Sequence, residues 1–164
     1  MYLLSSQEID IACLQVLYNL QAKRSHCYTF MKVLYDTGLR YNDVLLCFNT
    51  YVSGDSFIVQ PSKYNNARVI SLSSIPVIFQ EFVKGYDSLY FRISYQSLIR
   101  SLSQCSSYST LKIGKKSVLL HLFRHNYMKK LFLAGKSLSE IALITGEKHI
   151  SSVNSYVFSS IYTK

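Results

Sequence analysis

Apolar residues recur at helical spacing through most of this chain, and helix-start signals stand at the head of several repeats. Ser5 and Glu8 form a capping box, which predicts a helix from residue 5 to about Arg24. Ser137 and Glu140 form a second capping box. Further helices are predicted over 28–35, from about Tyr41, over 74–84, 95–103 and 118–133, from Ser137 to Gly146, and around Tyr156. Helices therefore dominate the predicted structure.

Residues 51–72 have a different character. Ser56–Val59 and Arg68–Leu72 are rich in β-forming residues, and Lys63–Asn66 between them predicts a hairpin turn. Residues 106–116 are rich in Ser, Gly and Lys and are predicted to form a loop. The pattern predicts a mainly α fold with a small antiparallel β-sheet (α+β). It shows no internal repeat and no evident linker, so we expect residues 1–164 to form a single domain.

The net charge of the chain indicates what kind of partner it binds. The 164 residues carry 18 Lys and Arg against 9 Asp and Glu, a formal net charge of +9. Such an excess favours a polyanionic partner, with nucleic acid ahead of a membrane surface. A basic protein without such a partner remains an alternative on charge alone. A hydrophobic content of 49% argues against a disordered chain.

The cysteines and the N-terminal residues bear on the cellular environment of the protein. Cys13, Cys27, Cys47 and Cys105 form no CxxC pair and lie among apolar residues, which predicts buried free thiols in a reducing, intracellular environment. No His or Cys pair has the spacing of zinc ligands, so we expect no metal site. The N-terminus lacks the basic region and long apolar stretch of a signal peptide, and no apolar run approaches 18 residues, so no membrane partner is expected.

Two short sequence motifs lie far apart in the chain, and fixed spacings connect the second motif to later residues. One is Thr37-Gly38-Leu39-Arg40, and the other is the H-x-x-R-H string from His121 to His125. The arginine of the second string is followed by Gly135 after 11 residues, by Gly146 after 22, and by Tyr156 ten residues beyond Gly146. Either string alone carries little information, whereas the complete spacing is specific.

This combination resembles the catalytic domain of the tyrosine recombinases, the phage-integrase and Xer-type family, over residues 5–158. The resemblance implies a mainly helical catalytic domain that cleaves and rejoins DNA strands at specific sites through a 3′-phosphotyrosyl intermediate. It implies double-stranded DNA as partner, self-association on that DNA, and neither a cofactor nor a small-molecule substrate. The expected location is the intracellular compartment that holds the target DNA.

The resemblance also assigns roles. Arg40 and Arg124 would bind the non-bridging phosphate oxygens, a task that suits the planar guanidinium fork. His121 shares a helix face with Arg124 at i and i+3, and it would accept the proton of Tyr156, the nucleophile. Lys63 in the hairpin turn would protonate the leaving 5′ oxygen. The resemblance implies a structural role for His125, and Tyr162 is the runner-up as nucleophile.

One position departs from the family pattern. The family has histidine or tryptophan directly after the glycine at Gly146, whereas this chain has Glu147. An ionised carboxylate cannot donate a hydrogen bond to phosphate, and it repels one. Either Lys148 or His149 takes over the donor role after a small loop shift, or Glu147 faces solvent and the donor is lost.

The chain also departs from the family in extent. No N-terminal core-binding domain precedes the catalytic domain here, and few residues follow Tyr156, which favours an excised catalytic fragment over a minimal enzyme. Two alternatives to a site-specific recombinase remain. One is an enzyme with the same residues but another product, a telomere resolvase or a type IB topoisomerase. The other is a DNA-binding module that has lost catalysis, for which Glu147 is the best evidence.

Overall fold

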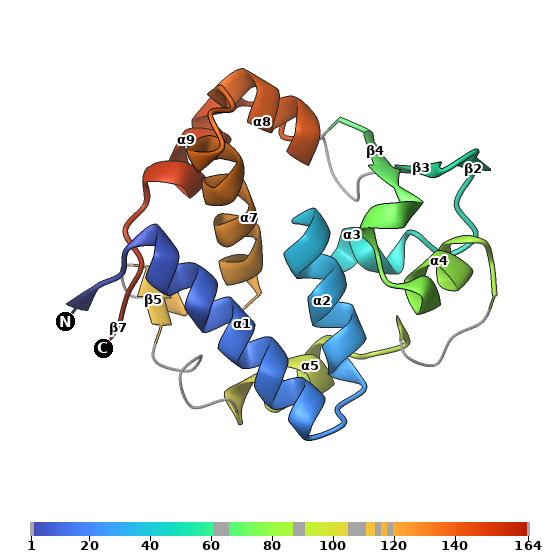
Figure 1. Cartoon of the computed structure of the whole chain (residues 1–164), viewed down its shortest axis with the longest axis horizontal. Coiled ribbons are helices and arrows are strands. Elements are labelled where there is room, and N and C mark those ends of the chain that lie inside the picture. The colour runs from blue at the N-terminus through green and yellow to red at the C-terminus, as the bar shows by residue number, and fades with distance from the viewer. Residues whose placement is uncertain are drawn as a thin grey trace.

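The computed structural model describes residues 2–60, 66–86, 91–104, 111–113, 116–117 and 120–163 (Figure 1). Over these residues the fold is mainly helical with small antiparallel sheets, so the predicted fold class is confirmed. The helices are α1 (Ser6–Ala22), α2 (Cys27–Thr37), α3 (Tyr41–Leu45), α4 (Val77–Val83), α5 (Tyr95–Ser103), α7 (His121–Leu133), α8 (Leu138–Thr145) and α9 (Ile150–Phe158). A 3-10 turn, η1 (Leu72–Ser74), precedes α4.

Local signals set the ends of α1. The Ser5 hydroxyl accepts the Glu8 backbone N–H at 3.2 Å, and the Glu8 carboxylate accepts the Ser5 backbone N–H at 2.8 Å, so the predicted capping box forms. The helix ends at Ala22 and not at Arg24, because Arg24 adopts a positive φ of 50°, outside the right-handed helical region. The second predicted capping box, before α8, is also present.

The predicted hairpin, β3 and β4, supplies two strands of a three-stranded antiparallel sheet. Its strands are β2 (Val52–Ser53), β3 (Ser56–Val59) and β4 (Arg68–Ser71), in the order β2-β3-β4. Val59 pairs with Arg68 in the register expected of a hairpin. Residues 61–65 of the connection, including Lys63, lie outside the described residues.

A second sheet accompanies the predicted one, and its strands replace part of the predicted loop, at residues 111–113 and 116. Its strands are β1 (Tyr2–Leu3), β5 (Leu111–Ile113), β6 (Lys116–Ser117) and β7 (Tyr162–Thr163), in the order β1-β7-β5-β6. These strands hold two or three residues each, too few for an alternating pattern to be visible. Strands β1 and β7 pair because the two ends of the described chain meet, which is information that no local pattern carries. Strand β5 pairs with β7 and with its neighbour in sequence, β6.

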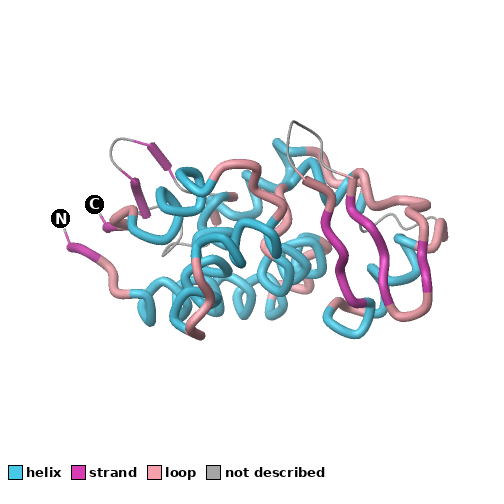
Figure 2. The backbone as a smooth tube through the Cα atoms, turned by 90° about the horizontal axis from the view of Figure 1, so that it is seen from above, coloured by secondary structure: helices cyan, strands magenta, loops and turns pink. Residues whose placement is uncertain are grey.

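The two sheets lie at opposite ends of the molecule, with the helices between them (Figure 2). Helix α7 packs against α1, α2, α8 and α9, and Figure 1 shows α8 and α9 beside it. The larger core cluster is drawn from α1, α2 and α7 together with the three-stranded sheet, α4 and α5. A smaller cluster joins α7, α8 and α9 and consists of Met128, Ile141, Ala142, Val153 and Val157. This smaller cluster holds α9 in place.

The three described cysteines are buried and free, as predicted from the sequence. They are Cys13, Cys27 and Cys47, and Cys105 lies outside the described residues. Burial raises the pKa of the Cys13 thiol and raises that of Cys47 to about 12, so both are protonated. In the described part of the chain, no helix has the length and apolar character to cross a membrane.

Candidate active site

Residues from four separate parts of the fold meet at one place. Arg40 is the N-cap of α3, directly after the turn that ends α2. His121 is the first residue of α7, and Arg124 lies one turn further along. Tyr156 belongs to α9, and Glu147 follows the glycine that ends α8. Ion pairs, a hydrogen bond and ring contacts connect these five side chains.

The turn after α2 positions Arg40. Gly38 adopts a left-handed φ of 62°, and its N–H donates to the Leu34 carbonyl at 2.8 Å. A Cβ at Gly38 would stand 2.5 Å from Cδ1 of Tyr127, so both conformation and space require glycine here. The Arg40 side chain that follows is 25% exposed, and its Nη1 lies 3.6 Å from Oδ2 of Asp43.

Arg124 is fixed by backbone carbonyls from two helix ends. Its guanidinium is almost fully buried, with Nη1 donating to the Gly38 carbonyl and Nη2 donating to the Thr145 carbonyl at 3.0 Å. The C-terminal ends of α2 and α8 are partially negative, which favours a cation between them. Burial and the charge of Arg40 lower the pKa of Arg124, and the carboxylate of Glu147 opposes that shift. The guanidinium stays charged at neutral pH.

Glu147 lies between the two arginines. One carboxylate oxygen, Oε1, accepts from Nη2 of Arg40 at 2.5 Å and from Nη2 of Arg124 at 2.6 Å. Glu147 is only 5% exposed, so the expectation that it faces solvent is wrong. Lys148 and His149, the other candidates for the donor position, are both exposed. The carboxylate therefore occupies a position where two guanidinium groups converge.

The backbone around Gly146 determines where Glu147 points. Gly146 adopts a left-handed φ of 70°, and the N–H of Glu147 donates back to the Ala142 carbonyl at 2.9 Å, as in a Schellman ending. The Gly146 carbonyl accepts the N–H of Asn66 at 3.1 Å. A Cβ at Gly146 would stand 2.7 Å from the Asn66 carbonyl oxygen and 2.8 Å from Cγ of Arg68. Glycine is therefore required by both conformation and contact.

Arg68 connects the three-stranded sheet to the same helix ends. It is buried, and its Nε donates to the Ile144 carbonyl at 2.8 Å while Nη2 donates to the Thr37 carbonyl at 2.5 Å. Burial and the nearby Arg124 lower its pKa to about 10. Among the described residues, its Nη1 has no hydrogen-bond partner. Arg68 thus adds a third positive charge behind Arg40 and Arg124.

Tyr156 lies against Arg124 and close to His121. The Arg124 Cζ is 5.7 Å from the centre of the Tyr156 ring, and the Tyr156 hydroxyl is 3.5 Å from Nδ1 of His121, at the outer limit of a hydrogen bond. Part of the His121 ring is open to solvent. Partial desolvation, then the charges of Arg124 and Arg40, lower its pKa. Neutral His121 can accept a proton from the hydroxyl.

His125 contacts both the backbone and the ring of Tyr156. Its Nδ1–H donates to the Tyr156 carbonyl at 3.0 Å, and the two rings meet edge to face with centroids 4.6 Å apart. Burial lowers the pKa of His125 to about 4, so the ring is neutral at ordinary pH. This geometry gives His125 structural contacts, as the resemblance implied.

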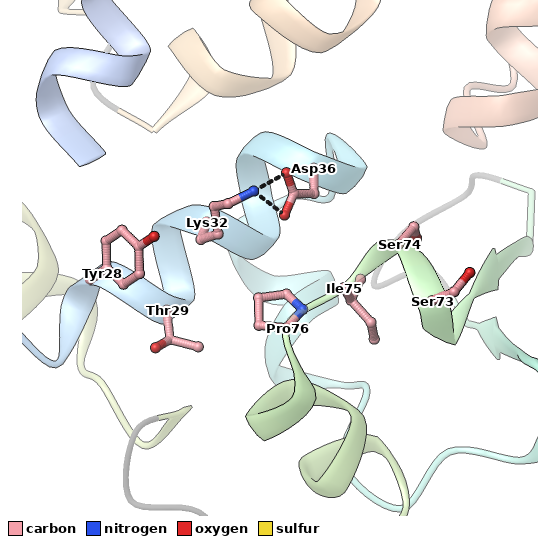
Figure 3. A pocket seen from close by; sticks show the side chains of 8 residues that line it. All are labelled: Tyr28, Thr29, Lys32, Asp36, Ser73, Ser74, Ile75 and Pro76. Carbon is pink, nitrogen blue, oxygen red and sulfur yellow. Dashed lines mark hydrogen bonds and ion pairs between the residues drawn. The ribbon is translucent and has the colours of Figure 1, made fainter. Parts of the chain in front are cut away.

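Other features lie apart from this site. No group of three or more His, Cys, Asp or Glu residues within the described ranges is arranged to hold a metal ion. A groove of about 450 Å³ runs between α2 and the η1–Pro76 segment, with the Lys32–Asp36 ion pair on its wall (Figure 3). It shares no lining residue with the arginine pair.

The sequence analysis missed the bridge that Glu147 makes. One local signal pointed toward it, because a glycine at the end of a helix fixes the direction of the next residue. The second partner of the bridge, Arg40, is 107 residues distant in sequence, so no local pattern could connect the two.

Comparisons with known proteins bear on the fold. No family model and no curated protein matches the chain. Among solved structures, the crystal structure of XerA recombinase is similar to 96% of this chain, with a TM-score of 0.62 and 18% sequence identity. The chain spans 60% of the length of that structure. The similarity concerns the fold and was anticipated by the motif spacing: this chain has a tyrosine-recombinase-like fold.

Proposed function

We propose that this chain cleaves and rejoins DNA strands at specific sites, with Tyr156 as nucleophile. The observation that carries this proposal is the convergence of Arg40 and Arg124 on one oxygen position, next to Tyr156 and His121. Two guanidinium groups aimed at one acceptor suit a phosphodiester. The net charge of +9 and the recombinase-like fold support DNA as the polyanion.

In the proposed reaction the two arginines hold the non-bridging oxygens of one phosphate. The Tyr156 oxygen attacks phosphorus, the bond from phosphorus to the 5′ oxygen breaks, and a 3′-phosphotyrosine forms. His121 accepts the hydroxyl proton, and Lys63, the residue proposed from the sequence, protonates the leaving 5′ oxygen. Rejoining reverses each transfer, so bond energy is conserved in the covalent intermediate.

Covalent trapping on a nicked suicide DNA substrate tests this proposal. The full chain should form a protein–DNA adduct that survives denaturation, and Tyr156→Phe should abolish it while DNA affinity stays within about twofold, because only the hydroxyl is lost. Tyr18→Phe is the matched control, since Tyr18 is an exposed tyrosine of α1. Adduct that persists in Tyr156→Phe would move the nucleophile elsewhere, with Tyr162 next to be tested.

A second function is favoured by one observation. Glu147 already occupies the acceptor position between Arg40 and Arg124, as expected of a DNA-binding module that no longer cleaves. In that case the wild-type chain binds DNA and never forms an adduct. If adduct does form, analysis of the product separates a recombinase from an enzyme that makes hairpin ends or one that relaxes supercoils.

A further inference from the structure

Glu147 bridges the two arginines at the oxygen position that a bound phosphate would need. Its Oε1 takes a hydrogen bond from Nη2 of Arg40 and another from Nη2 of Arg124. A non-bridging phosphate oxygen would use the same two donors. Carboxylate and phosphate cannot occupy one position, and at close range their charges repel.

We propose that Glu147 is an internal competitor for the phosphate position, which keeps the arginine pair occupied until DNA displaces it. This inference rests on the proposed function only in naming DNA as the natural ligand. The competition itself concerns an anion, the two arginines and the carboxylate. Displacement breaks the two ion pairs of Glu147. An anion that binds the arginines too weakly to offset this loss therefore does not displace the carboxylate.

The arginines do not depend on Glu147 for their positions. When the carboxylate leaves, Arg124 keeps its bonds to the Gly38 and Thr145 carbonyls. Arg40 keeps its contact with Asp43. The site that remains is therefore already formed, with its donors aimed at an empty acceptor position, and an incoming anion needs no rearrangement of the two guanidinium groups.

Charge balance explains why a carboxylate suits the free protein. Arg40, Arg124 and the buried Arg68 place three positive charges close together, and burial makes their mutual repulsion strong. Glu147 offsets part of this repulsion in the absence of DNA. A bound phosphate supplies the same negative charge, so the exchange of one anion for the other leaves the balance unchanged.

Sulfate binding tests the competition without any cleavage. Sulfate would be titrated into wild type, Glu147→Gln and Glu81→Gln by calorimetry, with sodium chloride holding the ionic strength constant. Glu81 is an exposed carboxylate of α4, so its variant controls for the loss of one negative charge. We expect Glu147→Gln to bind sulfate about tenfold more tightly than wild type, and Glu81→Gln to match wild type. Adding Arg40→Ala to Glu147→Gln should remove the gain.

A gain of less than about twofold in Glu147→Gln, or weaker binding, overturns the proposal and identifies Glu147 as a residue that positions the arginines. If Glu147→Gln does not fold, Glu147→Asp replaces it. The shorter carboxylate keeps the charge but cannot reach both donors, so sulfate should bind more tightly than to wild type, and unchanged affinity overturns the proposal.

Cleavage of the nicked substrate under single-turnover conditions separates this inference from the proposed function. If both hold, Glu147→Gln cleaves faster than wild type at subsaturating DNA. If sulfate binds more tightly to the variant and no variant forms an adduct, the competition stands and the cleavage proposal fails. If wild type cleaves and the variant gains neither sulfate affinity nor rate, the cleavage proposal stands and the competition fails.

Discussion

Arg40 and Arg124 share one acceptor but differ in how the protein holds them. Arg124 is buried and bonded to two backbone carbonyls, whereas Arg40 is 25% exposed at a helix start. The two side chains should therefore contribute alike to phosphate binding and differently to stability. Removal of a buried cation leaves its hydrogen-bond and ion-pair partners unsatisfied inside the protein. This destabilises a fold far more than removal of one partner of a surface ion pair.

Alanine substitution separates these contributions. Arg40→Ala and Arg124→Ala should each slow cleavage by on the order of 10²-fold or more, through lost charge stabilisation at phosphorus. Arg124→Ala should also lower the free energy of unfolding by about 3–5 kcal/mol, because the Gly38 and Thr145 carbonyls lose their donor together with Glu147. Arg40→Ala should lower it less, because Arg124 still pairs with Glu147 and the Arg40 side chain is partly exposed. Urea unfolding measures the difference, with the exposed Arg100→Ala as control, and equal losses for both variants would contradict this account.

The sequence predicted the site in part at this scale. Arg40, His121, Arg124 and Tyr156 do lie together, as the resemblance implied, although only His121 and Arg124 are related by local helix spacing. The position of Glu147 could not be predicted in the same way. It depends on how close the end of α8 comes to the start of α3, and tertiary packing alone determines that distance.

At the scale of the elements, the sequence predicted the capped helix starts well. It predicted the pairing of the short strands poorly. Both capping boxes formed. The helix expected from residue 74 begins at Val77 because Leu72–Ser74 forms a 3-10 turn and Pro76 stands at the helix start, where its missing N–H is tolerated. The second sheet was missed because its strands hold only two or three residues each, and because β1 and β7 come from the two ends of the described chain.

Two glycines at helix ends allow a matched test of the α8–α9 turn. Gly146→Ala should destabilise the fold more than Gly135→Ala by about 1–3 kcal/mol, the usual cost of overpacking. Both have positive φ, but a Cβ at Gly146 would stand 2.7 Å from the Asn66 carbonyl, whereas a Cβ at Gly135 meets nothing within 4 Å. Thermal or urea unfolding of the two variants gives the comparison. Equal destabilisation would show that strain in φ alone makes Gly146 necessary.

For the whole molecule, the buried His125 couples stability to pH. Its folded pKa is about 4, below the value near 6.5 of an unfolded chain, so the unfolded state binds more protons between these values. The stability that this group contributes is fully present above pH ~6.5 and is lost as pH falls toward ~4. It amounts to roughly 3 kcal/mol at most.

Urea unfolding between pH ~4 and ~7 measures this dependence against two variants. His125→Gln should be less stable than wild type at neutral pH and should lose less stability on acidification. His149→Gln, at an exposed histidine, should follow the wild-type curve. Parallel curves for wild type and His125→Gln would mean that other groups, such as the carboxylates, account for acid sensitivity.

The attachment of α9 at both ends limits the slack available to Tyr156. Three residues separate Gly146, which the Asn66 N–H holds, from the first residue of α9. Beyond α9 the Ile161 carbonyl accepts the N–H of Leu4 at 2.9 Å, and β7 pairs with both β1 and β5. A span fastened so closely at both ends can turn about its own axis or unwind locally, but it cannot swing away intact. Delivery of the tyrosine to a neighbouring molecule would require β7 to detach, which faster hydrogen exchange at its amides would reveal.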